Sequence, residues 1–550
     1  MKKLFKYWPL LAILALSSLI VWPLFMPGYF THHDDLQVMR IFEMKKCLQD
    51  LQIPCRFVPD MGYGNGYPLF NYYNPLPYYI GGVLSFFLSY LLSAKILFFI
   101  PLLLAGLSMY LLVKEILDKQ AAFLAAVLYL FAPYRALDSY VRGAVAESFA
   151  IALIPLVLYF ALKLIKNASR KYLIYFSVSL AAFLTSHTIM TLLFTPLLLF
   201  MVIYWMRTER KGRYVIYGLL LGFGLSAFFT LPAYFEKNLV QIDNLTKLDL
   251  DFRAHFVTLP QLFLDRSWGY GASFPGPLDS ISFQIGWPHW ILALLSLPVA
   301  FFLRRKDKKV FFYLGILGFF VFSIFMTHNK SALIWEKIGL LRFTQFPWRM
   351  LSVAIFTSSL LGGFLVFGLN RYLKNIVIIL LVLITVILNW SYFRPEKFIF
   401  NLTDQQKLSG RLWETQQKAS ILDYLPVGAG EPIEPAPPKP IIRSGQVDIK
   451  NFEKKSNSFK LDLEVKSPAK IEVPIMDFPN WIVFRNGSRI NYTNDNYVRR
   501  ISLDVPAGTY QFLGRFTDTP IRKVSNMLTL ISLIIILYLG FYGKIRKNYQ

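Results

Sequence analysis

Hydrophobic positions fall into long apolar runs through the first 390 residues, and one more run lies near the end of the chain. A helix needs about 20 such residues to cross the roughly 30 Å of bilayer hydrocarbon. The pattern therefore predicts an α-helical polytopic membrane protein. The apolar runs lie at 8–26, 75–92, 96–113, 120–133, 145–165, 172–186, 188–206, 214–235, 287–303, 310–327, 349–369, 375–390 and 524–542.

Short loops between these runs are strongly basic, and Lys and Arg in short loops mark the cytoplasmic face of a membrane protein. The first run follows a basic start, as a signal peptide does. It is long, however, and no small-residue cleavage site follows it, so we predict an uncleaved first span that leads to the outside. The basic clusters lie at 2–6, 163–171, 207–213, 304–309, 371–374 and 544–547.

This orientation conflicts with the number of runs near the N-terminus. The first span ends outside and the loop at 163–171 lies inside, so an odd number of spans must separate them. Four apolar runs lie between them, at 75–92, 96–113, 120–133 and 145–165, which is an even number. We therefore expect one run to be re-entrant or half-embedded. The candidates are 75–92, which contains Gly81-Gly82, and the short run 120–133. The total is then about 12 full spans plus one partial span, with both termini inside.

The outside loop at 27–73 combines an amphipathic segment with many turn residues. Residues 36–51 carry apolar side chains at helical spacing, which predicts a helix lying on the membrane interface. Residues 54–68 are dense in Gly and Pro and predict an irregular loop. The tyrosines after it suit an interfacial aromatic belt. They are Tyr72, Tyr73, Tyr78 and Tyr79.

Both cysteines of the chain, Cys47 and Cys55, lie in this loop. We expect two unpaired thiols, and the alternative is a disulfide in an oxidising compartment. The sequence shows no zinc-ligand spacing.

The pattern changes between 391 and 522, which we predict to be an extracytoplasmic domain. A Pro-rich linker at 431–442 precedes short stretches of alternating polar and apolar residues, such as 458–465. We therefore predict a small β-sandwich at 443–522. The predicted domains are 1–390 for the membrane region, 391–522 for the extracytoplasmic part, and 523–550 for a last transmembrane helix with a basic tail.

Composition and charge indicate which class of protein this is and which partner it has. The chain has 550 residues, of which 55% are hydrophobic and 17% aromatic, with a mean hydropathy of +0.44, and these values exclude a soluble globular domain. The net charge of +25 comes mainly from the basic loops. It therefore indicates a lipid bilayer as the partner and requires no nucleic acid.

Asp34 and Asp35 follow the first apolar run, at the predicted membrane surface. Charge near hydrocarbon is costly, so such residues are functional candidates, and the alternative is a solvated loop. A carboxylate here can take a proton from a hydroxyl, and the pair could also hold a divalent cation, Mg²⁺ or Mn²⁺. His32 and His33 could ligate a metal instead, although no ligand spacing indicates it.

Three further groups lie on the same predicted face. Arg142 suits a phosphate, because its guanidinium fork matches phosphate oxygens, or it pairs internally with Glu147. His187 lies between two runs and is either functional or a packing residue. Arg349 either contacts substrate or extends to the interface as a snorkelling arginine.

Several motifs are similar to a bacterial membrane family labelled "6-pyruvoyl-tetrahydropterin synthase-related", over the region to about residue 390. They are HDD at 33–35, GNGYPLF at 64–70, PLPYY at 75–79, YVRGAVAE at 140–147 and QFPWR at 345–349. The label alludes to pterin chemistry, which a multi-span chain without a histidine zinc site does not suit.

The layout also resembles the GT-C superfamily of glycosyltransferases and YfhO-like membrane proteins, and the C-terminal part around 478–510 is similar to the end domain of YfhO-like chains. The resemblance implies a GT-C-like protein of the bacterial plasma (inner) membrane. Its implied partners are a polyprenyl-phosphate sugar donor and an envelope glycan or lipid acceptor.

The resemblance implies inverting transfer of a sugar at the outer face. One of the two aspartates, with Asp34 preferred over Asp35, would take the acceptor's proton. The other would position the acceptor or share a cation, while Arg142, Arg349 and His187 would stabilise the leaving phosphate. Two alternatives are a non-catalytic transporter or flippase for lipid-linked glycans, and an assembly factor that binds envelope glycan. The complete set assigned to substrate binding is His33, Arg40, Tyr63, Arg142, Glu147, His187, Gln345 and Arg349.

Overall fold

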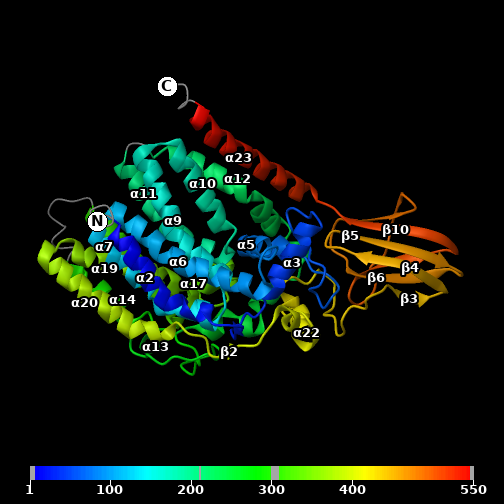
Figure 1. Ribbon diagram of the computed structural model, residues 1–550, viewed down its shortest axis with the longest axis horizontal. Helices are drawn as coiled ribbons and strands as arrows, with labels where there is room; N and C mark the ends of the chain where they lie inside the picture. Colours follow the sequence, from blue (N-terminus) through cyan, green and yellow to red (C-terminus); the bar gives the residue numbers. More distant parts are fainter. Residues whose placement is uncertain (1–6, 210–211, 299–308, 546–550) are drawn as a thin grey trace.

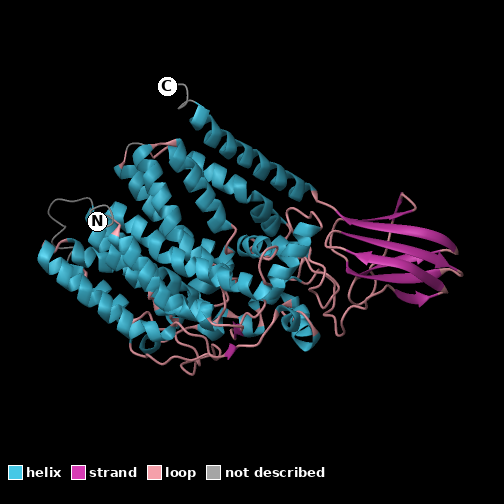
Figure 2. Ribbon diagram, in the orientation of Figure 1, coloured by secondary structure: helices cyan, strands magenta, loops and turns pink. Residues whose placement is uncertain are grey.

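The computed structural model describes residues 7–209, 212–298 and 309–545. It has two parts, a large helical bundle and a β-domain at one end of it (Figure 1). Strands are concentrated in the β-domain, and loops and short helices fill the junction between the two parts (Figure 2). The basic clusters predicted at 2–6, 207–213, 304–309 and 544–547 fall wholly or partly outside the described residues.

The bundle is built from the apolar runs, and side chains of Ser, Asp or Asn cap several of its helices. Asp118, for example, accepts from the backbone N–H groups of Gln120 and Ala121 at 2.9 Å, which starts the helix after it. The bundle helices are α2 (Trp8–Val21), α5 (Leu76–Leu84), α6 (Tyr90–Ile116), α7 (Lys119–Leu130), α8 (Pro133–Ala136), α9 (Val145–Asn167), α10 (Arg170–Leu184), α11 (Thr188–Thr208), α12 (Tyr214–Phe235), α14 (Trp287–Leu295), α16 (Lys309–Thr327), α19 (Leu351–Phe367), α20 (Arg371–Asn389) and α23 (Pro520–Ile545).

The apolar run at 75–92 is not a single helix. α5 has nine residues, which at 1.5 Å per residue is too short to cross a bilayer, and α6 begins separately at Tyr90. The other suspect run, 120–133, forms α7, which continues after a 45° bend into residues 133–141. Both segments that the sequence marked as irregular therefore depart from a straight span.

Nine helices of the described residues are long and apolar enough to cross a membrane, or up to ten if the bent pair is one span. α10 has 15 residues and α14 has nine, and the run predicted at 287–303 continues into residues outside the described part. The helical polytopic fold is confirmed, whereas the total of about 12 full spans stays a prediction.

The outside loop folds into a short strand and two helices: β1 (Tyr29–Phe30), α3 (Gln37–Gln49) and α4 (Leu69–Tyr72). The helix expected at 36–51 is therefore present. It does not lie on a free interface, however, because Met39, Ile41 and Met44 are each fully buried, and Ile41 and Met44 lie against Gly81 and Gly82 of α5. Protein, rather than lipid, covers its apolar side.

Cys47 and Cys55 form a disulfide that ties the end of α3 to the loop after it. The expectation of two unpaired thiols was therefore wrong. The sequence spacing alone could not decide between a bridge and free thiols, since the bridge depends on the chain turning back at Leu51 to Pro54.

Two long connections between bundle helices contain short helices. The first contains α13 (Leu259–Phe263), and a later one contains α17 (Ala332–Lys337), α18 (Gly339–Arg342) and the turn η8 (Pro347–Met350). The segment after α20 contains β2 (Phe398–Ile399), α21 (Asp404–Lys407), α22 (Gly410–Lys418) and η10 (Ile421–Tyr424). β2 pairs antiparallel with β1, so this late segment is attached to the outside loop.

The β-domain is a sandwich of two antiparallel sheets, as the alternating stretches predicted. One sheet has the order β4-β5-β10-β7-β8 and the other β3-β6-β9. Inward side chains from both sheets, such as Leu461, Val473 and Leu503, share one apolar core. The strands are β3 (Ile441–Ser444), β4 (Val447–Lys454), β5 (Ser458–Val465), β6 (Ala469–Met476), β7 (Trp481–Arg485), β8 (Ser488–Ile490), β9 (Arg500–Val505) and β10 (Gly508–Phe516).

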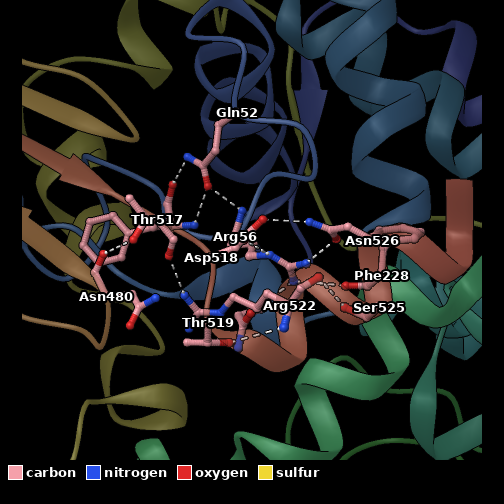
Figure 3. A network of polar contacts seen from close by, with 12 residues as sticks. Gln52, Arg56, Phe228, Asn480, Thr517, Asp518, Thr519, Arg522, Ser525 and Asn526 are labelled. Atoms are coloured by element: carbon pink, nitrogen blue, oxygen red, sulfur yellow. Dashed lines mark hydrogen bonds and ion pairs between the residues drawn. The ribbon is translucent and has the colours of Figure 1, made fainter.

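A polar network joins the β-domain to the bundle where β10 leads into α23 (Figure 3). Arg56 of the outside loop donates to the Phe228 carbonyl of α12 at 3.0 Å and to Asn526 of α23 at 2.8 Å. Arg522, fully buried, pairs with Glu236 at 2.9 Å. The outside loop, the end of α12 and the start of α23 are thereby held together.

Candidate active site

The acidic pair lies in the turn between β1 and α3. β1 leads out of the bundle, and α3 begins two residues after Asp35. Asp34 keeps 30% of its side-chain surface and Asp35 keeps 46%, although the helix that follows is buried. Both carboxylates thus lie in a turn between two elements that pack into the protein, and both remain accessible to a substrate.

Asp34 is held by two side chains of α3. Arg40 donates from Nη1 to Oδ2 of Asp34 at 2.7 Å, and Gln37 donates from Nε2 to the same oxygen at 3.2 Å. Within the described chain, Oδ1 of Asp34 has no hydrogen-bond partner. One oxygen therefore fixes the carboxylate and the other is available to accept a proton.

Arg40 lies among tyrosines of the segment 71–79. Its guanidinium stacks 4.2 Å from the Tyr73 ring centroid and donates to the Tyr78 hydroxyl at 3.3 Å. Tyr78 in turn donates to Gln37 at 2.8 Å and is fully buried. The interfacial-belt interpretation was wrong for Tyr78, whose neighbours belong to the acidic site.

Asp35 has a different partner. Lys407 of α21 lies 2.5 Å from its Oδ2, and His32 lies 3.9 Å from its Oδ1. Burial lowers the pKa of His32 to about 4, and the nearby Asp35 opposes this only in part. His32 is therefore uncharged near neutral pH, and Lys407 supplies the positive charge beside Asp35.

Backbone hydrogen bonds attach the acidic turn to the segment before α9. The N–H groups of His33 and Asp34 donate to the carbonyls of Val141 and Arg142, both at 2.9 Å. Gly143 follows with φ +68°, and a Cβ there would lie 2.2 Å from His32. Only glycine allows this close approach, so the motifs predicted separately at 33–35 and 140–147 meet here.

Arg142 belongs to a buried network of two arginines and two carboxylates. Its Nη1 lies 2.6 Å from Asp138 and 3.0 Å from Glu147. Arg349 also binds Glu147, at 3.1 Å, and Tyr134 donates to the other Glu147 oxygen at 2.5 Å. The internal pair of Arg142 with Glu147 is thus present, and Arg349 points into the protein instead of snorkelling to the interface.

Gln345 and His187 lie beside these arginines. Gln345 accepts from Nη1 of Arg349 at 3.1 Å and has a left-handed backbone with φ +64°. His187 caps α11 by accepting from the Met190 N–H at 3.2 Å. Burial lowers the pKa of His187 to about 3, so this ring is neutral and adds no positive charge for a phosphate.

His33 and Tyr63 lie further out. The His33 ring bonds to the Tyr270 carbonyl at 2.9 Å, and the Tyr63 hydroxyl donates to Glu414 of α22. The Tyr63 side chain is therefore bonded to α22. The structure brings the other candidates into two adjacent groups, one around Asp34 and one around Arg142.

Sequence reasoning missed Gln37, Asp138, Lys407 and Asp423. Asp423 of η10 interacts electrostatically with Arg40 and Asp34, and burial raises its pKa to about 6. Lys407 and Asp423 come from the segment after the last bundle helix, so no local pattern connected them with residues 34 and 35. Gln37 and Asp138 had a signal, since both lie within one helical turn of a candidate residue.

Among the described residues, the acidic pair lacks the ligands that the expected cation needs. No group of three or more His, Cys, Asp or Glu side chains in the described ranges is arranged to hold a metal ion. Both carboxylates of the pair already have a cationic partner, Arg40 or Lys407. As they stand, these residues do not fit a shared Mg²⁺ or Mn²⁺.

An open groove of about 530 Å³ lies beside the acidic turn, at the start of α6. Lys95 and Asp404 are on its walls, and Asp404 accepts from the N–H groups of Tyr90 and Leu91. Its apolar wall includes Gly28, Leu91, Leu92 and Leu402. The groove does not contain the Asp34 carboxylate, so it adjoins the site without being its centre.

Comparisons with known proteins give a family and several distant resemblances. A family described as "6-pyruvoyl-tetrahydropterin synthase related domain; membrane protein" matches residues 70–395. An uncharacterized protein of Lactococcus lactis subsp. cremoris is 23% identical over 363 residues, which are 61% of this chain and 54% of that protein. The chain thus spans about half the length of this relative.

Two kinds of solved structure resemble the chain. The arabinofuranosyltransferase AftD from Mycobacteria matches with a TM-score of 0.43 and 14% identity, over 70% of this chain and 27% of that one. The oligosaccharyltransferase of Archaeoglobus fulgidus matches with a TM-score of 0.40 and 15% identity, over 71% of this chain and 56% of that one.

Proposed function

The chain belongs to the 6-pyruvoyl-tetrahydropterin synthase related family of membrane proteins, and we propose that it is a glycosyltransferase. It moves a sugar from a polyprenyl-phosphate donor to a cell-envelope acceptor, with Asp34 as the catalytic base. The observation that carries the proposal is the backbone contact between Asp34 and Arg142, because it joins a proton acceptor to a phosphate-binding type of side chain.

The proposed reaction is a direct displacement. The acceptor hydroxyl gives its proton to Oδ1 of Asp34 while its oxygen forms a bond to the anomeric carbon. The bond from that carbon to the phosphate oxygen breaks, and the electron pair leaves on the polyprenyl phosphate. Attack opposite the leaving group inverts the anomeric configuration, and Asp35 positions the acceptor.

In the proposed reaction, the leaving phosphate contacts Arg142 and Arg349. Arg142 uses Nη1 for its two carboxylates, and its guanidinium lies 4.6 Å from the Trp348 ring centroid. Among the described residues, its Nε and Nη2 have no hydrogen-bond partner. Those N–H groups can donate to phosphate oxygens. Neutral His187 can donate a hydrogen bond, and Gln345 orients Arg349.

The site is proposed to face the outside of a bacterial plasma membrane. The Cys47–Cys55 disulfide closes the loop that carries the acidic pair, and disulfides persist in oxidising compartments. The β-domain lies beside that loop, so it is proposed to be extracytoplasmic as well.

The test is transfer of radiolabelled sugar from a panel of polyprenyl-phosphate sugars by the purified protein in lipid. Asp34→Asn is expected to reduce transfer about 10²- to 10⁴-fold, and Asp504→Asn, an exposed aspartate of the β-domain, is the matched control. Full transfer by Asp34→Asn would refute the mechanism. Saturable binding of donor lipid without turnover would favour a transporter or assembly factor instead.

A further inference from the structure

The segment after the last bundle helix is attached beside the acidic pair. Tyr29 and Phe30 of β1 pair with Ile399 and Phe398 of β2. Gly28 permits this contact, since a Cβ there would lie 2.1 Å from the Ile399 carbonyl. The two strands run antiparallel, and the chain leaves β1 for Asp35 and leaves β2 for α21.

α21 is fixed by contacts of its own. Asp404 accepts from the N–H groups of Tyr90 and Leu91 at 2.6 and 3.0 Å, which joins α21 to the start of α6. Gln416 of α22 donates to the Lys407 carbonyl at 2.7 Å. The backbone of Lys407 is therefore held from two sides, independently of its ammonium group.

The Lys407 side chain lies on the protein side of Asp35. Only 3% of it is exposed, against 46% for Asp35, and its Nζ lies 2.5 Å from Oδ2 of Asp35. The cation thus contacts one carboxylate oxygen from within, and the carboxylate remains open to solvent. A lysine that merely covered the carboxylate would show the opposite exposures.

The titratable groups that face Asp35 are Tyr29, His32, Asp34 and Lys407. Asp34 has its own partner, Arg40, and His32 is neutral. Of the described residues, Lys407 is therefore the one positive charge that contacts Asp35.

We propose that Lys407 is a positioning residue, which holds the Asp35 carboxylate in place with its free side directed outward to the acceptor. This inference rests on the proposed function. It makes the active site composite, because Asp35 precedes and Lys407 follows residues 70–395, the part of the chain that matches the family. The segment 398–407 is then part of the catalytic centre, and not only a connection to the β-domain.

The first test compares Lys407→Met, Lys407→Arg and Lys439→Met in the full-length protein, with kcat and KM for donor and acceptor measured in lipid. Lys439 is an exposed lysine of the Pro-rich linker and serves as the control. Lys407→Met should lower kcat up to about 100-fold with little change in the donor KM, because a misplaced catalytic group slows the chemical step. Lys407→Arg should restore most of the rate.

The second test needs no turnover. The melting temperatures of Asp35→Asn, Lys407→Met and the double variant form a cycle. Asp35→Asn leaves a buried ammonium without a partner, so it should melt at a lower temperature than Asp35→Asn/Lys407→Met.

The results of the two tests distinguish the role of Lys407 from the proposed glycosyltransferase function. A cycle without coupling would show that the ion pair does not form and would overturn the inference. Coupling together with a normal kcat in Lys407→Met would overturn the positioning role alone and leave the proposed function intact. No transfer by the wild-type protein from any donor would overturn the proposed function, and the role of Lys407 with it.

Discussion

The N–H of Asp34 donates to the carbonyl of Arg142 at 2.9 Å, across more than 100 residues of chain. Gln37 adds a second link by donating to the Gly143 carbonyl at 2.8 Å. The carboxylate that is proposed to take a proton and the guanidinium that is proposed to face a phosphate therefore share one piece of backbone. Moving either segment moves both groups.

Gly143→Ala should separate these two segments. The new Cβ would lie 2.2 Å from the His32 ring, and φ +68° disfavours any residue with a Cβ. We expect a loss of at least about 1 kcal/mol in stability and a large loss of transfer, measured by thermal unfolding and by the radiolabel assay. Gly368→Ala, where nothing lies within 4 Å of the added Cβ, should leave both unchanged. Equal behaviour of the two variants would contradict the prediction.

Glu147→Gln should be strongly destabilising. Glu147 is fully buried and contacts both Arg142 and Arg349, so removing its charge leaves two buried cations with Asp138 alone. Breaking a buried pair in this way costs about 3–5 kcal/mol, measurable as a lower melting temperature in detergent.

Arg349, which contacts Glu147, provides the control for the melting experiment on Glu147→Gln. Adding Arg349→Met to Glu147→Gln removes the surplus cation, so the double variant should recover part of the loss. A double variant less stable than Glu147→Gln would show that the contacts of Arg349 with Thr344 and Gln345 stabilise the fold more than its unpaired charge destabilises it.

Stability should also depend on pH through Asp423. Burial raises its pKa from 3.8 to about 6, and the nearby Asp34 adds to this while Arg40 opposes it. The folded protein thus favours the neutral carboxyl, and this contribution is complete below pH 3.8 and is lost as the pH rises through about 6. Above pH 6, Asp423→Asn should therefore melt at a higher temperature than the wild type. Near pH 4, the two proteins should melt at similar temperatures. A constant difference across that range would refute the shift.

Arg522→Met should loosen the β-domain from the bundle. Arg522 is fully buried against Glu236, and its ring neighbours are Phe478 and Phe516 at 5.1 and 5.0 Å. Removing the cation leaves the Glu236 carboxylate buried without this partner and weakens the junction. Limited proteolysis should cut near 517–523 faster than in the wild type. Arg515→Met, an exposed arginine of β10, should not change the cleavage rate.

The sequence was informative where one local pattern decides the structure. Apolar runs predicted the bundle, and alternation predicted β5 at the bounds observed, Ser458–Val465. The apolar side of α3 was also visible, but its period is the same whether lipid or protein covers it. Only the packing of Gly81 and Gly82 against α3 decides that question.

The residues of the candidate site also differ in how far the sequence could predict them. Asp34, Arg142 and Arg349 stand out because charge is rare beside apolar runs. Lys407 and Asp423 do not, because charge is ordinary in a polar segment. Their place beside Asp35 and Arg40 depends on the pairing of β1 with β2, which no local pattern specifies.

That pairing also has a consequence for how the protein is made. Lys407 and Asp35 are 372 residues apart, so a chain emerging from the ribosome inserts most of its helices before α21 exists. Until then, the acidic turn has neither the strand partner nor the ammonium group that it contacts in the finished fold. Completion of this turn is a late event of biogenesis, and a chain released early carries the acidic motif without the arrangement around it.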